Sequence, residues 1–110
     1  MKVGVREVID SGHFLPGHAK CGRPHGHTYR LELVAEGPVS AGMVIDFADL
    51  KAALREAARP FDHVMLNDLI AVPTCENLAA EIHRRVRERV GLTLTLRVWE
   101  GEGKYAEITG

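Results

Sequence analysis

The sequence predicts an α+β fold in which two helices cover one face of a four-stranded antiparallel sheet. Apolar residues alternate with a period of two near both ends of the chain, and the middle of the chain shows helical spacing instead. The predicted order of elements is therefore ββααββ. With 110 residues the chain has room for one core, so we expect a single domain over residues 1–110.

Two strands are expected in the first third of the chain. Residues 3–11 carry apolar side chains at odd positions, and a second alternating run starts near His27 and ends at Gly37-Pro38. The apolar face of the second run consists of Tyr29, Leu31, Leu33 and Ala35. The connection between the two runs is long for a hairpin, and loops of that length are often functional.

Two helices and two further strands follow. Asp46 is the expected cap of a helix that begins at Phe47 and ends before Pro60, and its apolar stripe is Phe47, Leu50, Leu54 and Ala57. Thr74 is the expected cap of a second helix, with Gly91 as its left-handed stop. Residues 92–98 alternate again, and residues 105–109 offer a short final strand.

Composition excludes several classes of function. The formal net charge is −1 and the charged residues are interspersed, so nothing resembles a nucleic-acid-binding surface. The apolar runs are too short to span a membrane. Two cysteines far apart in the sequence do not form a disulfide framework, and we expect a reducing cytoplasm.

Three histidines indicate a metal centre. His25 and His27 are two residues apart, so both rings lie on one face of an extended strand, and the first strand can bring His13 beside them. Three imidazoles without a fourth protein ligand leave an open position, as catalytic zinc sites do. Zinc is the expected ion, although copper, nickel and iron also accept imidazoles, and a purely structural histidine pair is the alternative.

Cys21 lies four residues before His25 and has three possible roles. Neighbouring Lys20 and Arg23, with a cation nearby, favour the reactive thiolate. The thiol can also serve as a fourth metal ligand, or the residue can be a small loop residue without chemistry. The other cysteine, Cys75, is expected to pack in the first turn of the second helix.

Polar residues elsewhere suggest proton transfer and ligand binding. Asp62 and His63 form a carboxylate–imidazole pair in which Asp62 makes His63 more basic, or they simply make a turn. Glu100 continues the buried face of the third strand, so it either pairs with Lys104 or accepts two hydrogen bonds from an amidine-like edge of a ligand. Thr74, at a positive helix start, can help to orient that ligand.

Together these residues resemble the 6-pyruvoyl-tetrahydropterin synthase superfamily, and most closely its 6-carboxytetrahydropterin synthase branch from queuosine biosynthesis. The resemblance covers essentially the whole chain. Its motifs are Cys21-x-x-x-His25-Gly26-His27 with His13 upstream, Val44-Ile45-Asp46-Phe47, Asp62-His63 followed by Leu66-Asn67, Pro73-Thr74-x-Glu76-Asn77, and Glu100. The fold implied by the resemblance, the ββααββ tunnelling fold, is the one predicted above from periodicity.

The resemblance implies a role for each candidate residue. His13, His25 and His27 would hold catalytic zinc, and Cys21 would accept a proton. Asp62 and His63 would complete the proton relay. Glu100 would anchor a pterin ring with help from the Thr74 region. The implied reaction converts 7,8-dihydroneopterin triphosphate to 6-carboxy-5,6,7,8-tetrahydropterin, acetaldehyde and triphosphate.

The resemblance also implies an assembly. Family members form trimers that close a twelve-stranded barrel, and two trimers stack into a hexamer. A small sheet with two open edges agrees with this, because open edges need covering. The face away from the helices carries a mixed set that suits a barrel lining: Arg6, Val8, Arg30, Glu32, Arg97 and Trp99.

Two segments depart from the family pattern. Ile9-Asp10-Ser11-Gly12 precedes His13 where an aromatic residue and small alanines are usual, and Gly101 follows Glu100 in place of a threonine. The metal site is therefore more firmly indicated than the identity of the substrate.

Three other functions compete with this one. A 6-pyruvoyl-tetrahydropterin synthase would eliminate triphosphate without losing carbons. A cupin would use His25, His27 and Glu32, but cupins are all-β and Glu32 falls on the opposite strand face. A metal- or pterin-binding module without turnover is the third alternative.

Overall fold

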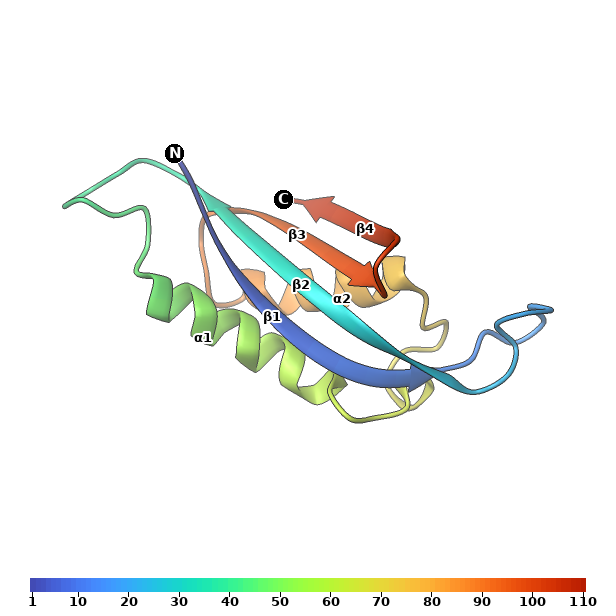
Figure 1. Ribbon diagram of the computed structural model, residues 1–110. Helices are drawn as coiled ribbons and strands as arrows, with labels where there is room; N and C mark the ends of the chain where they lie inside the picture. Colours follow the sequence, from blue (N-terminus) through green and yellow to red (C-terminus); the bar gives the residue numbers. More distant parts are fainter.

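The computed structural model describes all 110 residues, and its elements follow the predicted order (Figure 1). The strands are β1 (Lys2–His13), β2 (His25–Glu36), β3 (Thr93–Glu100) and β4 (Lys104–Thr109). The helices are α1 (Phe47–Ala58) and α2 (Cys75–Arg87), with short 3-10 turns at Arg59–Phe61 and Leu66–Asp68. The predicted ββααββ fold class is therefore confirmed.

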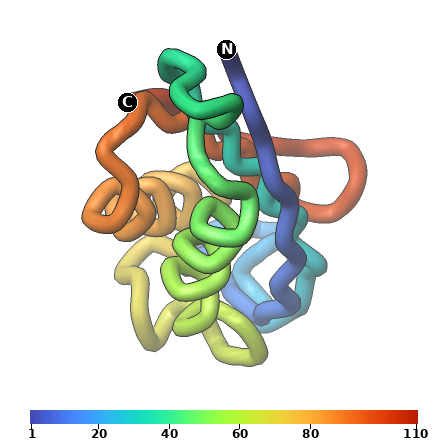
Figure 2. Tube along the Cα trace, turned by 90° about the vertical axis from the view of Figure 1, so that its left-hand side faces the viewer, coloured from blue at the N-terminus to red at the C-terminus, as the bar shows by residue number.

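The four strands form one antiparallel sheet in the order β1-β2-β3-β4, and both helices lie on the same face of it (Figure 2). β1 and β2 are the long strands, and β3 pairs with β2 only as far as Tyr29, which faces Glu100. The β1–β2 hairpin therefore extends past the rest of the sheet, and the 14–24 loop at its tip extends further still (Figure 1).

The core lies between the sheet and the helices. Its strand residues occupy odd positions in β1 and β2 and even positions in β3, as the alternation predicts: Ile9, Tyr29, Leu31, Leu33, Ala35, Leu94, Leu96 and Val98. Complete burial of one such leucine side chain contributes about 1.5–3 kcal/mol to folding. The parity has a consequence for function, because His13 and Ser11 continue the buried face at the end of β1.

Both predicted helix caps are present. The side chain of Asp46 accepts a hydrogen bond from the backbone N–H of Ala48, and Thr74 accepts one from Asn77. These bonds satisfy backbone donors that the first helical turn leaves free. No helix of the chain is both long and apolar enough to cross a membrane.

Two details of the helix prediction were wrong. Phe47 was assigned to the apolar stripe of α1, but it is 58 % exposed because the first position of the helix lies beyond the edge of the core. Gly91 was expected to end α2 in the left-handed conformation, but α2 ends earlier, at Arg87, and Gly91 is not among the glycines with positive φ.

Candidate metal centre and its surroundings

The three predicted imidazoles meet at the end of the β1–β2 hairpin. His13 faces His25 in the strand register, and His27 lies two residues further along β2. One ring nitrogen from each residue lies within 4.8 Å of the other two. His13 is buried and the other two are half-buried. We call these residues the imidazole group, and its geometry is able to hold one metal ion.

Hydrogen bonds to the backbone fix the orientation of two of these rings. His13 Nδ1 lies 2.7 Å from the carbonyl oxygen of Pro73, and His25 Nδ1 lies 2.7 Å from that of Arg23. A carbonyl oxygen only accepts, so both Nδ1 atoms carry the proton. In the neutral rings, both Nε2 lone pairs then face each other across 3.0 Å. Lone pairs so close repel unless a cation lies between them.

The third imidazole presents a free nitrogen. His27 Nε2 is buried and has no hydrogen-bond partner. It lies 3.1 Å from Glu100 Oε1, but the geometry of that contact is not that of a hydrogen bond. Burial lowers the pKa of His27, and the nearby Glu100 carboxylate only partly opposes this effect. A neutral imidazole with an unpartnered nitrogen is the form that binds a metal, so the donor set fits a divalent ion such as zinc.

A second group of ionisable residues lies at the outer edge of β1. His63 Nδ1 is 2.9 Å from Asp62 Oδ1, and the same oxygen accepts a 2.9 Å hydrogen bond from the backbone N–H of Asp10. The backbone N–H of His63 in turn donates to the Asp10 carbonyl at 2.7 Å. The bond from Asp10, together with His63, lowers the pKa of Asp62. We call Asp10, Asp62 and His63 the edge group.

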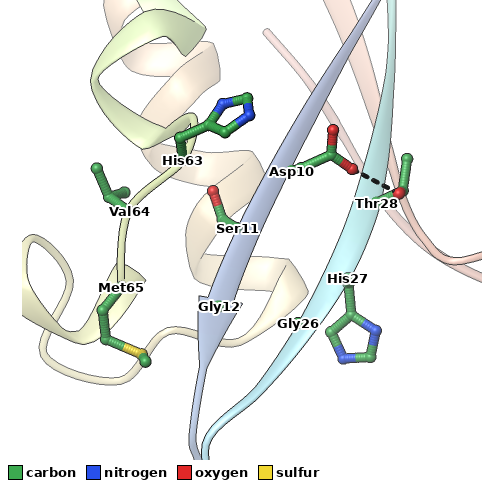
Figure 3. Close-up of a pocket in the computed structure, with 9 residues that line it drawn as sticks. All are labelled: Asp10, Ser11, Gly12, Gly26, His27, Thr28, His63, Val64 and Met65. Carbon is green, nitrogen blue, oxygen red and sulfur yellow. Dashed lines mark hydrogen bonds between the residues drawn. The ribbon is translucent and has the colours of Figure 1, made fainter.

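The edge group borders an open hollow of about 560 Å³ on the sheet. Gly12 and Gly26 are paired across β1 and β2 there, and the hollow is lined by His27 of the imidazole group as well as by Asp10 and His63 of the edge group. Figure 3 shows His63 on the segment beside β1, with His27 on the far side of the β1–β2 pair. Both groups therefore border this hollow within one chain, but their nitrogen and oxygen ligand atoms form two separate clusters.

Cys21 lies in the 14–24 loop, and its backbone is held from two directions. Its N–H donates to His18 Nδ1 at 3.0 Å, and its carbonyl accepts from the Leu15 N–H at 2.7 Å. The thiol is not part of the imidazole group. Cys75 has the packing role expected for it: its Sγ donates to the Val98 carbonyl, and burial raises the pKa of this thiol to about 11.

The two residues expected to bind the ligand come from different elements: Glu100 from the end of β3 and Thr74 from the start of α2. Glu100 ends β3 with its side chain 15 % exposed, and Lys104 Nζ lies 3.9 Å from its Oε1, a looser contact than the one with His27. Thr74 caps α2, and the residue before it, Pro73, supplies the carbonyl that holds His13. The start of α2 is thus tied to the imidazole group.

Sequence analysis missed the structural role of Asp10. The residue was noted only as a departure from the family pattern, but its backbone binds both Asp62 and His63, and its side chain accepts a hydrogen bond from Thr28 at 2.6 Å (Figure 3). The sequence shows only that Asp10 and Thr28 are polar residues on the outer strand faces, because their pairing depends on the register of the hairpin.

Comparison with known proteins places the chain in one enzyme family. Residues 2–110 match the family model described as 6-pyruvoyl tetrahydropterin synthase. A protein of Archaeoglobus fulgidus, provisionally named 6-carboxy-5,6,7,8-tetrahydropterin synthase, is 40% identical over 98% of this chain and 95% of its own length. The dihydroneopterin monophosphate aldolase of Pyrococcus furiosus is 39% identical over 70% of each chain.

The fold is also that of a solved structure. The 6-pyruvoyl tetrahydropterin synthase of Caenorhabditis elegans superposes with a TM-score of 0.90 over 100% of this chain and 95% of that one, at 21% identity. The family model and the full-length relative together identify the chain as a member of the 6-pyruvoyl tetrahydropterin synthase family, a family of tetrahydropterin synthase enzymes.

Proposed function

We propose that the protein is a zinc-dependent synthase that converts 7,8-dihydroneopterin triphosphate and water to 6-carboxy-5,6,7,8-tetrahydropterin, acetaldehyde and triphosphate, a step in making 7-deazapurines such as queuosine. It is thus a lyase that breaks carbon–oxygen and carbon–carbon bonds. The observation that supports the metal requirement is the pair of Nε2 lone pairs of His13 and His25, which face each other at 3.0 Å beside the free Nε2 of His27. The full-length 40% identity supports the carboxy product.

Different residues of the chain have different roles in this reaction. His13, His25 and His27 would hold zinc, which polarises the side-chain oxygens of the substrate and makes the neighbouring carbon-bound proton easier to remove. Cys21 accepts that proton as a thiolate. Asp62 holds His63 through Nδ1, which leaves Nε2 of this exposed ring to give or take a proton.

Glu100 and Thr74 supply recognition of the pterin ring. A carboxylate accepts two parallel hydrogen bonds from an N–C–N edge, and Glu100 is mostly shielded from water, which strengthens such bonds. Thr74 lies at the start of α2, where free backbone N–H groups and the helix dipole favour electron-rich atoms of a ligand.

The separation of the two groups supports a site that is shared between subunits. Because the edge group lies apart from the imidazole group in one chain, we propose that a neighbouring copy completes the site in a hexamer of two trimers. Sedimentation at micromolar concentration tests this assembly, and a stable monomer would contradict it. The unpaired state of both cysteines is consistent with a location in the cytoplasm.

A product assay tests the reaction. Zinc-loaded protein is incubated with 7,8-dihydroneopterin triphosphate, and the products are identified by mass beside a Cys21→Ala variant. We expect acetaldehyde and the carboxypterin from the natural protein, and a large loss of rate in the variant. An absence of acetaldehyde would refute the reaction, and unchanged turnover in the variant would remove Cys21 from its role.

One relative supports a second candidate function. The similarity to a dihydroneopterin monophosphate aldolase suggests carbon–carbon cleavage of a monophosphate. An aldol cleavage leaves the phosphate on the released fragment, whereas the preferred reaction releases free acetaldehyde and triphosphate. Offering both substrates in the same assay separates the two candidates. A product that keeps all its carbons after losing triphosphate would instead indicate a 6-pyruvoyl-tetrahydropterin synthase.

A further inference from the structure

The hydroxyl of Tyr29 is a buried polar atom that packing does not explain. The residue is fully buried in the core, and the hydroxyl has no hydrogen-bond partner. Buried tyrosine hydroxyls normally find a partner, and an unsatisfied one is destabilising. Phenylalanine would fill the same space without that cost. The buried hydroxyl is therefore expected to have a hydrogen-bond partner in a different state of the molecule.

Tyr29 lies directly beside the proposed site. It faces Glu100 in the β2–β3 register, and side chains at facing positions of antiparallel strands lie close together on the same side of the sheet. Its ring also lies edge to face with the rings of His27 and His13, at centroid distances of 5.8 and 6.3 Å. The residue thus connects the imidazole group to the carboxylate that ends β3.

Glu100 is the acceptor best suited to this hydroxyl. The Tyr29 phenol offers an O–H donor, and a carboxylate oxygen is a strong acceptor for it. The sulfur of Cys75 is already engaged with the Val98 carbonyl. The Glu100 carboxylate takes part in no hydrogen bond: His27 Nε2 lies 3.1 Å from its Oε1, and Lys104 Nζ, its charged neighbour, lies 3.9 Å away.

We propose that Tyr29 is a positioning residue for Glu100, whose carboxylate accepts a hydrogen bond from the Tyr29 hydroxyl once His27 Nε2 binds a cation. The cation then occupies the nitrogen that Glu100 now approaches, and Tyr29 is the buried donor facing that carboxylate. This inference rests on the proposed function, in which Glu100 anchors the pterin ring. A hydrogen bond from Tyr29 would fix the plane in which the carboxylate meets the two N–H groups of that ring.

A spectroscopic experiment tests the contact without any turnover. The chain has two tyrosines, so protein labelled with ¹³C at tyrosine Cζ gives two signals, which Tyr105→Phe assigns. We expect zinc to shift the Tyr29 signal in the natural protein but to have far less effect on it in Glu100→Ala. An equal shift in both proteins would mean that the hydroxyl does not bind Glu100, and the inference would be wrong.

A binding experiment tests the consequence of the contact. Without metal, Tyr29→Phe should melt at the same or a higher temperature, because the hydroxyl that it lacks has no partner in that state. Zinc-loaded Tyr29→Phe should keep one metal per chain but bind the fluorescent ring compound pterin about 10-fold more weakly, the effect of losing a hydrogen bond to a charged group. Tyr105→Phe, an exposed tyrosine, should change nothing. Adding Tyr29→Phe to Glu100→Ala should cause no further loss.

The outcomes separate this inference from the proposed function. If the natural zinc-loaded protein does not bind pterin, the proposed function fails, while the ¹³C signal still decides whether Tyr29 contacts Glu100. If pterin binds equally well to Tyr29→Phe, or if the losses in the double variant multiply, the proposed function stands and the positioning role is refuted.

Discussion

The imidazole group and the edge group both lie beside the β1–β2 hairpin, but they differ in burial and in the state of their polar atoms. The first is at least half-buried, lies on the helix side of the sheet and has free ring nitrogens that face one another. The second is largely exposed, lies at the outer edge of β1 and has its carboxylate already bound by a backbone N–H and an imidazole. The geometry of the first group suits the proposed cation, and that of the second suits the proposed proton transfer.

This difference follows from where each side chain leaves the backbone. In β1 and β2 the odd positions point to the core, so His13 is buried and His27 is half-buried, and burial lowers the pKa of His27. Asp10 is at an even position, and Asp62 and His63 come from a loop beside the edge strand. Water therefore reaches the edge group, as a site that exchanges protons requires.

Removal of one imidazole should produce the largest difference in metal content between variants of the two groups. His27→Ala takes away a ligand, and because loss of an outer-sphere partner alone costs about 10–100-fold in metal affinity, we expect a greater loss here. His63→Ala is the matched control from the edge group and should keep its metal. Elemental analysis after dialysis measures both. Full metal content in His27→Ala would show that the ligand set is wrong.

A variant of the edge group should show the opposite behaviour to His27→Ala: it should lose turnover but keep its metal. His63→Gln keeps a polar side chain but loses the titrating group, and we expect the rate to fall by about 10²–10⁴-fold, the usual contribution of a general acid or base. Zinc content should not change, because the edge group lies apart from the imidazoles. A variant that turns over normally would remove His63 from the relay.

Helix caps offer a smaller and paired test. Thr74→Ala and Asp46→Ala each remove a side-chain cap, so each should lower the free energy of unfolding by about 1 kcal/mol in chemical denaturation. Only Thr74→Ala should also weaken metal binding, because Pro73 beside it holds His13. Equal metal affinity in the two variants would mean that the cap of α2 does not support the imidazole group.

The smallest effect concerns pH. The pKa of Asp62 is lowered in the folded chain, so its charge stabilises the fold above the ordinary value of 3.8, and this contribution disappears as the pH falls through the lower, folded value. Asp62→Asn should therefore differ from the natural protein near pH 5 but not at the acid end of a denaturation series. A constant difference at all pH values would mean that the charge plays no part.

The periodic parts of the molecule were predictable from the sequence. Alternation with period two places His13, His27 and Glu100 on the buried face, because that rule depends only on the strand backbone. The pairing of His13 with His25 needs the hairpin register, which a loop of irregular length does not fix. Asp10 was missed for a related reason: its partner Asp62 is 52 residues away, and Asp62 and His63 reach it through a turn, not a repeat.

The prediction for Phe47 failed for another physical reason. Helical spacing gives the direction of a side chain around the helix axis but not whether the core extends along the axis to meet it. At Phe47, in the first turn of α1, it does not.

Because β3 pairs with only part of β2, the tip of the β1–β2 hairpin has fewer neighbouring strands than the rest of the sheet. β3 and the turn after it bind β2 only up to Tyr29 and Thr28, so residues 25–27 have β1 as their sole neighbouring strand. An ion held by residues of both strands would act there as a cross-link, and through the Pro73 carbonyl it would also fasten α2 to the tip. Amide hydrogens of residues 25–27 should then exchange more slowly in the loaded protein, and the 14–24 loop should resist proteases longer.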